Sequence, residues 1–209
     1  MTRLLVIFAA TCAVGFGLTV SAEMTFDREQ LVLAERDGMT VVSLGRYVGA
    51  WETGAPAVPV AVAQLVVPPG MKVMGVTVDT VETEMVGTYD LYPVQPPVPL
   101  SATDTPDFVP PDPKYYDSVY PGEVAVAGHQ GSMFGYNIAS VFIAPVQYDG
   151  ADKSLVFHLR VRFTLELEPA ELGYLRPGNR SPEARRRVEA ILAGIVLNPQ
   201  DVASCAPVP

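Results

Sequence analysis

Cysteine and histidine are scarce in this chain of 209 residues. The sequence has two cysteines, Cys12 and Cys205, and two histidines, His129 and His158. Cys12 lies in an apolar N-terminal segment that has the features of an export signal, so the exported chain would keep Cys205 alone. A single cysteine excludes an intramolecular disulfide and a thiolate metal cluster. With so few metal ligands of either kind, we expect no metal site and no cofactor.

Positive charge is also scarce. The chain has 14 basic residues against 23 acidic residues, which gives a formal net charge of −9. Nucleic-acid binding begins with the neutralisation of phosphates, and attraction to an anionic membrane surface needs clusters of basic residues. The charge balance therefore disfavours both nucleic acid and an anionic membrane as partners.

Recognisable catalytic motifs are absent as well. The sequence has no Gly-x-Ser-x-Gly elbow, no phosphate-binding loop, no dinucleotide fingerprint and no His-Glu-x-x-His. Residues 128–132 bring His129 close to Ser132 in sequence, but catalytic triads are assembled from distant parts of a fold. We interpret this segment as a turn with an exposed histidine. Cys205 lies in a proline-rich tail, where we expect nothing to hold it against a histidine, so no catalytic residue is predicted.

The first 22 residues have the layout of a secretory signal peptide. A basic residue precedes an uncharged apolar stretch, and small residues lead up to Ala22 and Glu23. We therefore expect cleavage between Ala22 and Glu23, with a secreted, periplasmic or cell-surface location and no membrane association after cleavage. An uncleaved membrane anchor and a lipid-modified Cys12 are the alternatives.

Alternation of apolar and polar residues dominates residues 26–168. The clearest case is residues 157–168, where every odd position is apolar and every even position is polar, His158 included. This pattern predicts a long strand with one buried and one solvated face. The segment 72–86 changes phase near Asp79 and Thr80, which predicts a β-bulge there. Residues 30–34 and 40–47 are expected to form a hairpin, with Arg36, Asp37 and Gly38 as its turn, and further strands are expected at residues 60–67, 124–127 and 138–144.

The order of these elements indicates the fold class. Short turns separate the strands, and no helical pattern appears before residue 182, whereas a parallel sheet needs crossover helices. Residues 182–197 then carry apolar residues at helical spacing, with Ser181 as the expected N-cap. The sequence predicts an all-β protein, an antiparallel β-sandwich followed by one C-terminal helix.

Residues 93–121 differ from the rest because they are rich in proline and contain three tyrosines. Proline removes ladder donors, so this segment cannot be a central strand. We expect a long ordered excursion that crosses the surface or reaches a partner, and the alternative is a loop packed by its own tyrosines. The acidic residues Asp104, Asp107 and Asp112 lack the glycine-centred turn of a calcium loop, so we interpret them as solvated charges.

A series of short pieces gives the sequence a specific resemblance. They are residues 54–60 (GAPAVPV), 66–73 (VVPPGMKV), 92–97 (YPVQPP), 115–121 (YYDSVYP), 144–148 (APVQY) and the strand-like run 155–168. In that order and spacing they resemble the N-terminal propeptide of gingipain-like cysteine peptidases, the C25 family. The likeness covers roughly residues 26–170.

The resemblance implies a domain organisation. It implies a signal peptide (1–22), a propeptide-like β-sandwich (23–170), and a linker (171–209) leading to a caspase-like catalytic domain that this chain does not contain. That catalytic domain is the implied partner, in cis if the reading frame continues past Pro209. The implied function is non-catalytic: the propeptide blocks the peptidase cleft, assists folding and is removed by proteolysis. The other interpretation is a stand-alone secreted β-sandwich binding module.

Basic residues are the candidates for inhibition and processing. Lys114 is the sole basic residue of the segment 93–121, and it would suit the specificity pocket of a peptidase that cleaves after basic residues. A solvated lysine is the alternative. Exposed linkers concentrate cleavage, so five arginines after the last predicted strand are candidate processing sites, although the last three also suit a basic helix face. These are Arg176, Arg180, Arg185, Arg186 and Arg187.

Overall fold

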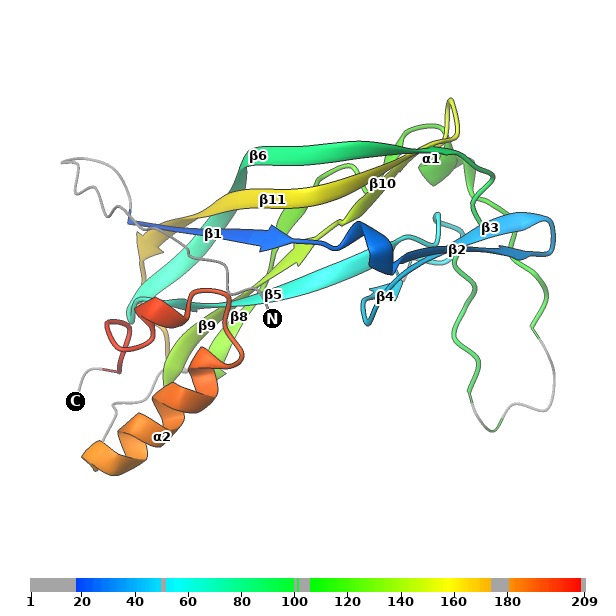
Figure 1. The fold of residues 1–209 in the computed structure, drawn as a ribbon. Helices are drawn as coiled ribbons and strands as arrows, with labels where there is room; N and C mark the ends of the chain where they lie inside the picture. Colours follow the sequence, from blue (N-terminus) through cyan, green and yellow to red (C-terminus); the bar gives the residue numbers. More distant parts are fainter. Residues whose placement is uncertain (1–17, 50–51, 100, 102–105, 174–180, 208–209) are drawn as a thin grey trace.

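The fold is an antiparallel β-sandwich, as predicted. A computed structural model describes residues 18–49, 52–99, 101, 106–173 and 181–207 (Figure 1). The first sheet contains β1 (Thr19–Thr25), β6 (Met71–Thr88), β7 (Val119–Tyr120), β10 (Val146–Asp149) and β11 (Ser154–Pro169). The second sheet has the order β4 (Val48–Gly49), β5 (Pro59–Val67), β9 (Tyr136–Ile143) and β8 (Ala125–Met133). The remaining elements are the hairpin of β2 (Leu31–Arg36) and β3 (Met39–Leu44), and the short helices η1 (Arg28–Gln30), α1 (Pro113–Tyr116) and η2 (Pro199–Asp201) beside α2 (Pro182–Ala193).

Strand β11 is the centre of the first sheet. It pairs with β6 along one edge and with β10 and β1 along the other. The apolar face predicted for it is buried, with Phe157, Val161, Phe163 and Leu165 all at 0% exposure. They pack against fully buried residues of the opposite sheet, so the alternation in sequence produces the core between the two sheets.

The predicted outward orientation of His158 is wrong. Its side chain is only 2% exposed, and neither ring nitrogen has a hydrogen-bond partner among the described residues. The pairing of β11 with β6 shifts register between His158 and Arg160, so the strand is irregular at this point. A strict period of two does not anticipate such a shift.

The predicted β-bulge in β6 is confirmed. Arg162 of β11 pairs with Thr80 and Phe163 pairs with Val78, so Asp79 has no residue opposite it. The carboxylate of Asp79 accepts a hydrogen bond of 2.8 Å from the Thr164 hydroxyl. The extra residue restores the inward facing of the apolar side chains on both sides of the bulge.

Other local expectations differ in outcome. The hairpin of β2 and β3 is confirmed, and Asp37 and Gly38 turn it with φ of 51° and 77°, the positive values that a tight primed turn needs. The strands expected at 60–67 and 138–144 are β5 and β9.

The turn predicted at residues 128–132 is wrong, because these residues continue β8 and pair with β9 from Gln130 onward. Residues 19–22, which we assigned to the signal peptide, form the first half of β1.

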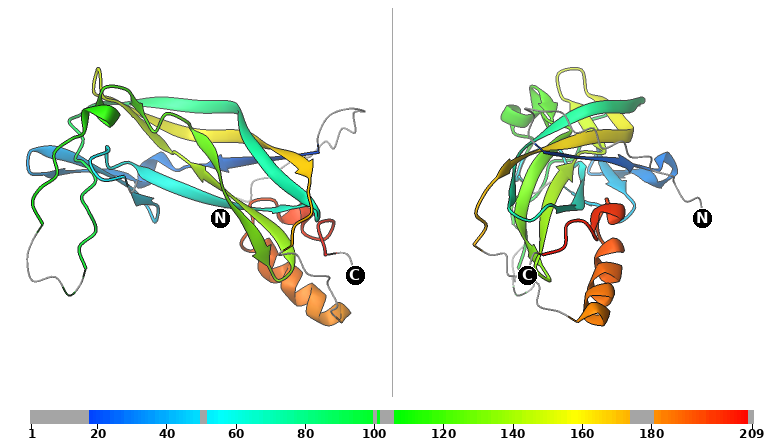
Figure 2. Two further views of the ribbon diagram at one scale, coloured as in Figure 1. Left: turned by 180° about the vertical axis from the view of Figure 1, so that it is seen from behind. Right: turned by 90° about the vertical axis from the view of Figure 1, so that its left-hand side faces the viewer.

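The C-terminal helix packs on the sandwich. Ser181 caps α2 as predicted, its hydroxyl accepting a hydrogen bond of 3.3 Å from the amide of Ala184. The helix ends at Ala193 rather than at residue 197, and Gly194 follows it. Figures 1 and 2 show α2 at one end of the sandwich, with the β2–β3 hairpin and the proline-rich segment at the other. No helix in the described part of the chain is long and apolar enough to cross a membrane.

Candidate functional site: the proline-rich excursion

Residues 93–121 form an excursion at the end of the sandwich opposite α2 (Figure 2). The structure describes residues 93–99, 101 and 106–121 of it. The chain leaves after Tyr92, returns through residues 106–112, and re-enters the first sheet at β7. The excursion is therefore held at both ends by the folded body.

Gly54 holds the base of the excursion. Its amide donates to the carbonyl of Val94 (2.9 Å), and its carbonyl accepts from the amide of Asp112 (3.0 Å). Gly54 has φ of 85°, and a Cβ there would lie 3.1 Å from the Cβ of Asp112. The outgoing and returning arms thus meet on one residue, where a side chain would be strained.

Gln95 braces the two arms further out. Its amide nitrogen donates to the carbonyl of Val109 (2.9 Å), and its amide oxygen accepts from the Val109 backbone N–H (2.9 Å). The same nitrogen lies 3.1 Å from the carbonyl of Pro93. Prolines cannot donate such bonds, so one glutamine side chain replaces the ladder that two strands would form.

Aromatic contacts tie the returning arm to the sandwich. The ring centroid of Phe108 lies 5.7 Å from that of Tyr92. The guanidinium of Arg36, on the β2–β3 hairpin, lies 4.8 Å from the ring centroid of the same tyrosine. Tyr92 is 6% exposed, whereas Phe108 remains 48% exposed. The packed tyrosine supports a phenylalanine that is still available to a partner.

The short helix α1 carries Lys114. Asp112 caps this helix by accepting a hydrogen bond of 2.9 Å from the Lys114 amide. The lysine side chain is exposed, and its ammonium lies 4.7 Å from the ring centroid of Tyr115 and 3.3 Å from that residue's hydroxyl. A cation held along an aromatic ring loses less freedom than a free lysine when it enters a pocket.

Two tyrosines fix α1 and the adjoining strand β7 to neighbouring loop segments. The Tyr116 hydroxyl donates to the carbonyl of Leu91 (2.8 Å), and the Tyr120 hydroxyl donates to the carboxylate of Glu52 (2.5 Å). Burial raises the pKa of both phenols above the usual range, and the neighbouring Glu52 adds to the rise for Tyr120. Both phenols stay protonated as donors. The ring of Tyr115 lies 5.4 Å from that of Tyr120 within the excursion, and the ring of Tyr116 lies 5.8 Å from that of Tyr148 in β10, while Lys114 remains exposed.

The geometry of the excursion suits steric recognition. It presents prolines, one exposed phenylalanine and one cation on a braced frame, and its described residues bring no nucleophile and general base together. Among the described residues, no group of acidic, histidine or cysteine side chains is arranged to hold a metal ion. Asp104 lies outside the described residues.

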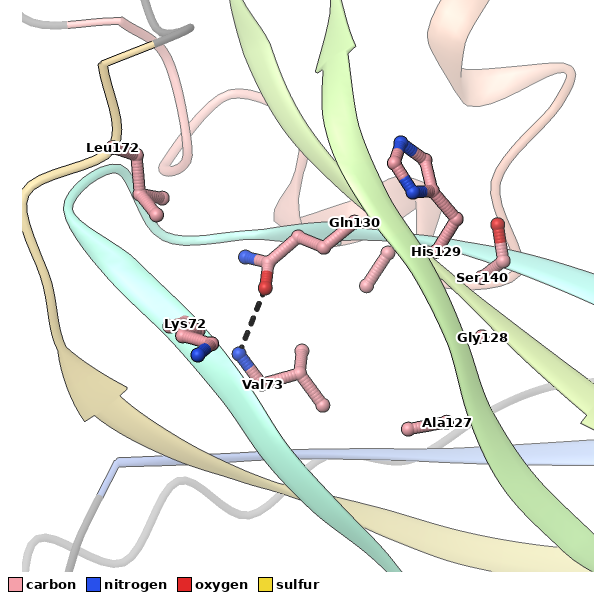
Figure 3. A pocket seen from close by; sticks show the side chains of 9 residues that line it. Lys72, Val73, Ala127, Gly128, His129, Gln130, Ser140 and Leu172 are labelled. Carbon is pink, nitrogen blue, oxygen red and sulfur yellow. Dashed lines mark hydrogen bonds between the residues drawn. The ribbon is translucent and has the colours of Figure 1, made fainter.

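A small pocket of about 300 Å³ lies between β6 and β8, away from the excursion. Figure 3 shows Lys72 and His129 on opposite walls, with Gln130 between the strands. Gln130 accepts from the amide of Val73 (2.9 Å) and donates to the carbonyl of Met71 (2.8 Å). The glutamine side chain thus links β8 to the start of β6, and the residues that line the pocket include no convergent set of reactive groups.

The remaining candidates for chemistry are His129, Ser132 and Cys205. His129 lies where the register of β8 shifts between Ala127 and Gln130, and both His129 and Ser132 are exposed on this strand. Cys205 is only 4% exposed, and burial raises the pKa of its thiol to about 11, so it is a poor nucleophile. The tail does hold Cys205 in place, contrary to expectation, but in an apolar cluster rather than beside a histidine.

The predicted processing residues are divided between two regions. Arg176 and Arg180 lie outside the described residues, whereas Arg185, Arg186 and Arg187 lie on the exposed side of α2. Two of the latter make ion pairs one helical turn away, Arg185 with Glu189 (2.8 Å) and Arg187 with Glu183 (2.5 Å). A regular helix is a poor protease substrate, since cleavage needs an extended backbone.

The predicted signal-cleavage residues lie in the middle of β1. Ala22 is buried and lies opposite Phe163 in the strand pair. Glu23 lies opposite Arg162, and the two side chains form an ion pair of 2.8 Å. Val20, upstream of the predicted cut, is also buried. Cleavage between Ala22 and Glu23 would therefore remove the first four residues of β1.

Sequence reasoning missed the residues that brace the site. Gly54 and Gln95 appeared there only as members of two of the short pieces that carry the resemblance. The available signal for Gln95 was its place among prolines, where a side chain with both donor and acceptor groups substitutes for absent backbone donors. Asn198, to which the sequence analysis assigned no role, binds the backbone of β5 at Val66.

Comparisons with known proteins agree with this architecture. A solved complex of the Porphyromonas gingivalis RgpB pro- and mature domains matches with a TM-score of 0.66 at 18% identity, over 87% of this chain and 92% of that chain. A structure of Porphyromonas gingivalis gingipain K, concerned with its zymogenic latency, matches with a TM-score of 0.57 at 22% identity, over 77% of this chain and 98% of that chain. At these identities the likeness shows a shared fold. A search of curated proteins gives no match.

A family model supplies the assignment. The model described as the C25 propeptide, Propeptide_C25, matches residues 17–174, well over half of the chain. Its span includes both sheets, the braced excursion and Lys114. The resemblance inferred from the short sequence pieces is thereby confirmed. The chain belongs to the C25 propeptide family.

Proposed function

We propose that this chain keeps a gingipain-like cysteine peptidase latent by placing its proline-rich excursion in the peptidase cleft. The observation that carries the proposal is the brace: in a family of propeptides, residues 93–121 are tied down at Gly54 and Gln95 yet leave Lys114 exposed. A preorganised segment pays little entropy on binding, which favours tight obstruction of a cleft.

Lys114 is the proposed specificity contact. It is the one basic side chain on an excursion that also carries four carboxylates. Lys114 is therefore the one side chain of the excursion that a pocket selective for basic residues could bind. The short helix α1 and its cap at Asp112 hold Lys114 outside an extended conformation. An extended backbone is what a peptidase cleaves, so a lysine presented this way would occupy the pocket and resist cleavage.

The proposed domain organisation follows the sequence prediction. Residues 1–22 direct export to a secreted, periplasmic or cell-surface location, residues 23–170 form the inhibitory and folding-assisting sandwich, and residues 171–209 lead to the catalytic domain. Arg176 and Arg180, which precede α2, are proposed as processing sites ahead of Arg185, Arg186 and Arg187. The ion pairs on α2 support this order, since the helix must unwind before the latter three can be cut.

The experiment is an inhibition assay with the purified exported chain and a C25 peptidase that cleaves after lysine. We expect stoichiometric inhibition, and we expect Lys114→Ala to weaken it by about tenfold or more, the loss of one charged contact. The matched control is Lys72→Ala, a lysine exposed at a different place on the sandwich. No inhibition by the folded chain would favour the stand-alone binding module, and equal effects of the two variants would remove Lys114 from the contact.

Export is tested separately by N-terminal sequencing of the secreted chain. A start at Glu23 is expected, with the ion pair from Glu23 to Arg162 retained. A start upstream of Thr19 would contradict the predicted cleavage site and would keep β1 whole.

A further inference from the structure

The C-terminal arm, residues 181–207, lies outside the span of the family model, which ends at residue 174. It contains α2, η2 and the segment that follows them. Figure 1 shows the arm lying against the second sheet, at its β5–β9 side. The arm therefore needs an explanation of its own.

The arm closes an open sheet edge. β4 pairs with only the first two residues of β5, Pro59 and Val60, and the rest of that edge has no strand beside it in the described structure. Asn198 occupies it instead: its amide oxygen accepts from the Val66 backbone N–H (2.9 Å), and its amide nitrogen donates to the Val66 carbonyl (2.9 Å). The Leu197 amide adds a bond of 2.7 Å to the carbonyl of Gln64. The arm thus satisfies backbone groups that an exposed edge leaves open.

The same arm buries a second apolar cluster, separate from the core between the sheets. Four of its side chains are nearly or fully buried against three residues of β5 and β9. On the arm these are Leu192 (0% exposed), Val196 (6%), Val202 (2%) and Cys205 (4%), and on the sandwich they are Val66, Tyr136 and Ile138.

A polar rim surrounds this cluster. Glu189 of α2 accepts a hydrogen bond of 3.2 Å from the Tyr136 hydroxyl and an ion pair of 2.8 Å from Arg185. The side chain of Asn198 also donates to Asp201 within the arm (2.9 Å). An apolar centre, a polar rim and satisfied backbone bonds are the features of an interface between two separately folded parts.

We infer that residues 181–207 are a docking arm that binds the β5–β9 surface through its own interface, so that a cut between Gly173 and Ser181 leaves the two parts associated. The buried cluster and the contacts of Asn198 are made by residues of the sandwich and of the arm on either side of that region. Release of the sandwich then needs a second step, the undocking of the arm. The effect of this second step on a peptidase rests on the proposed function, whereas the docking of the arm on the sandwich does not.

The test uses the full chain carrying Cys12→Ser, with a site-specific protease sequence inserted after Gly173. Cys205 is then the sole thiol, and its labelling rate by a thiol reagent reports whether the arm is docked. After the cut, we expect the labelling rate to change by less than about twofold and the two fragments to co-elute in size-exclusion chromatography, since local opening controls the labelling. Separation of the fragments with rapid labelling would overturn the inference.

Matched variants keep the test specific. Leu192→Asp places a charge in the apolar cluster and should release the arm after the cut, with labelling faster by about tenfold or more. Ile191→Asp, one residue earlier at a position 49% exposed, should keep the fragments together. Release by both variants, or by neither, would contradict the assigned interface. A chain that docks its arm but fails to inhibit any peptidase would contradict the proposed function alone.

Discussion

The sandwich core and the proline-rich excursion achieve order by opposite means. In the core, Phe157, Phe163 and Leu165 are completely buried, and the strands pair along long antiparallel ladders. In the excursion, few residues are fully buried, and single side chains such as Gln95 replace the missing ladder. The core is stabilised by many interchangeable contacts, whereas the shape of the excursion depends on a few particular ones.

This difference suits a propeptide. A fold that must resist unfolding while it presents a fixed loop benefits from separating the two tasks. Substitutions in the core should lower the free energy of unfolding of the whole domain, and substitutions in the excursion should change its local order or its binding.

The largest effect is expected from Phe163→Ala. The ring is 0% exposed between the sheets, and truncating a buried phenylalanine costs about 3–5 kcal/mol through lost burial and the cavity left behind. Denaturant unfolding should show this loss. Phe108→Ala, at a position 48% exposed on the excursion, is the control and should cost far less. Similar losses for both would remove the distinction between core and excursion.

The next effect is a dependence of stability on pH. Burial lowers the pKa of His158 from 6.5 to about 4, so the unfolded chain binds a proton that the folded chain rejects between these values. Stability is therefore complete above pH 6.5 and falls as the pH is lowered toward 4, by about 3 kcal/mol for this one group.

The variant His158→Phe checks this origin. It should flatten the decline of the unfolding free energy between pH 6.5 and 4, because the buried titratable ring is gone. His129→Phe, at the exposed second histidine, should keep the decline. If the unfolding free energy of the His158 variant declined as steeply between pH 6.5 and 4 as that of the unsubstituted chain, other groups would be the cause of the decline.

A smaller effect is expected from Gln95→Ala. Removing the side chain leaves the Val109 amide without its partner, at a cost of about 1–2 kcal/mol confined to the excursion. Hydrogen exchange at Val109 should accelerate, while amides of β9 and β11 keep their protection. Accelerated exchange across the sheets as well would show that the excursion is coupled to the core.

The smallest effect on stability is expected from Lys114→Ala, within about 0.5 kcal/mol for an exposed side chain. Its thermal unfolding should match that of the unsubstituted chain, even though its inhibition is weaker. A large loss of stability would mean that Lys114 supports the excursion rather than a partner.

Local patterns predicted much of this fold correctly. The alternation at 157–168 predicted β11, the phase change predicted the bulge at Asp79, and glycine after Asp37 predicted the hairpin turn. These features depend on neighbours in sequence, which is why they are readable there. Prediction failed at His158 and at residues 128–132, where pairing with another strand overrides the local pattern.

The candidate site was predictable in part. Its proline content marked the excursion, and Lys114 was identifiable as the one basic residue within it. Its anchors were not identifiable, because Gly54 and Asp112 lie far apart in sequence and meet only through the returning chain. The position of the C-terminal arm was unreadable for the same reason.

The sequence by itself determined the family and the antiparallel sandwich, because composition, periodicity and ordered short motifs are local properties. The tertiary structure decided which polar side chains hold the loop, that Asn198 closes the edge of β5, and that His158 and Cys205 are buried. Each of these depends on contacts between residues distant in the chain, and such contacts are fixed only when the two sheets pack.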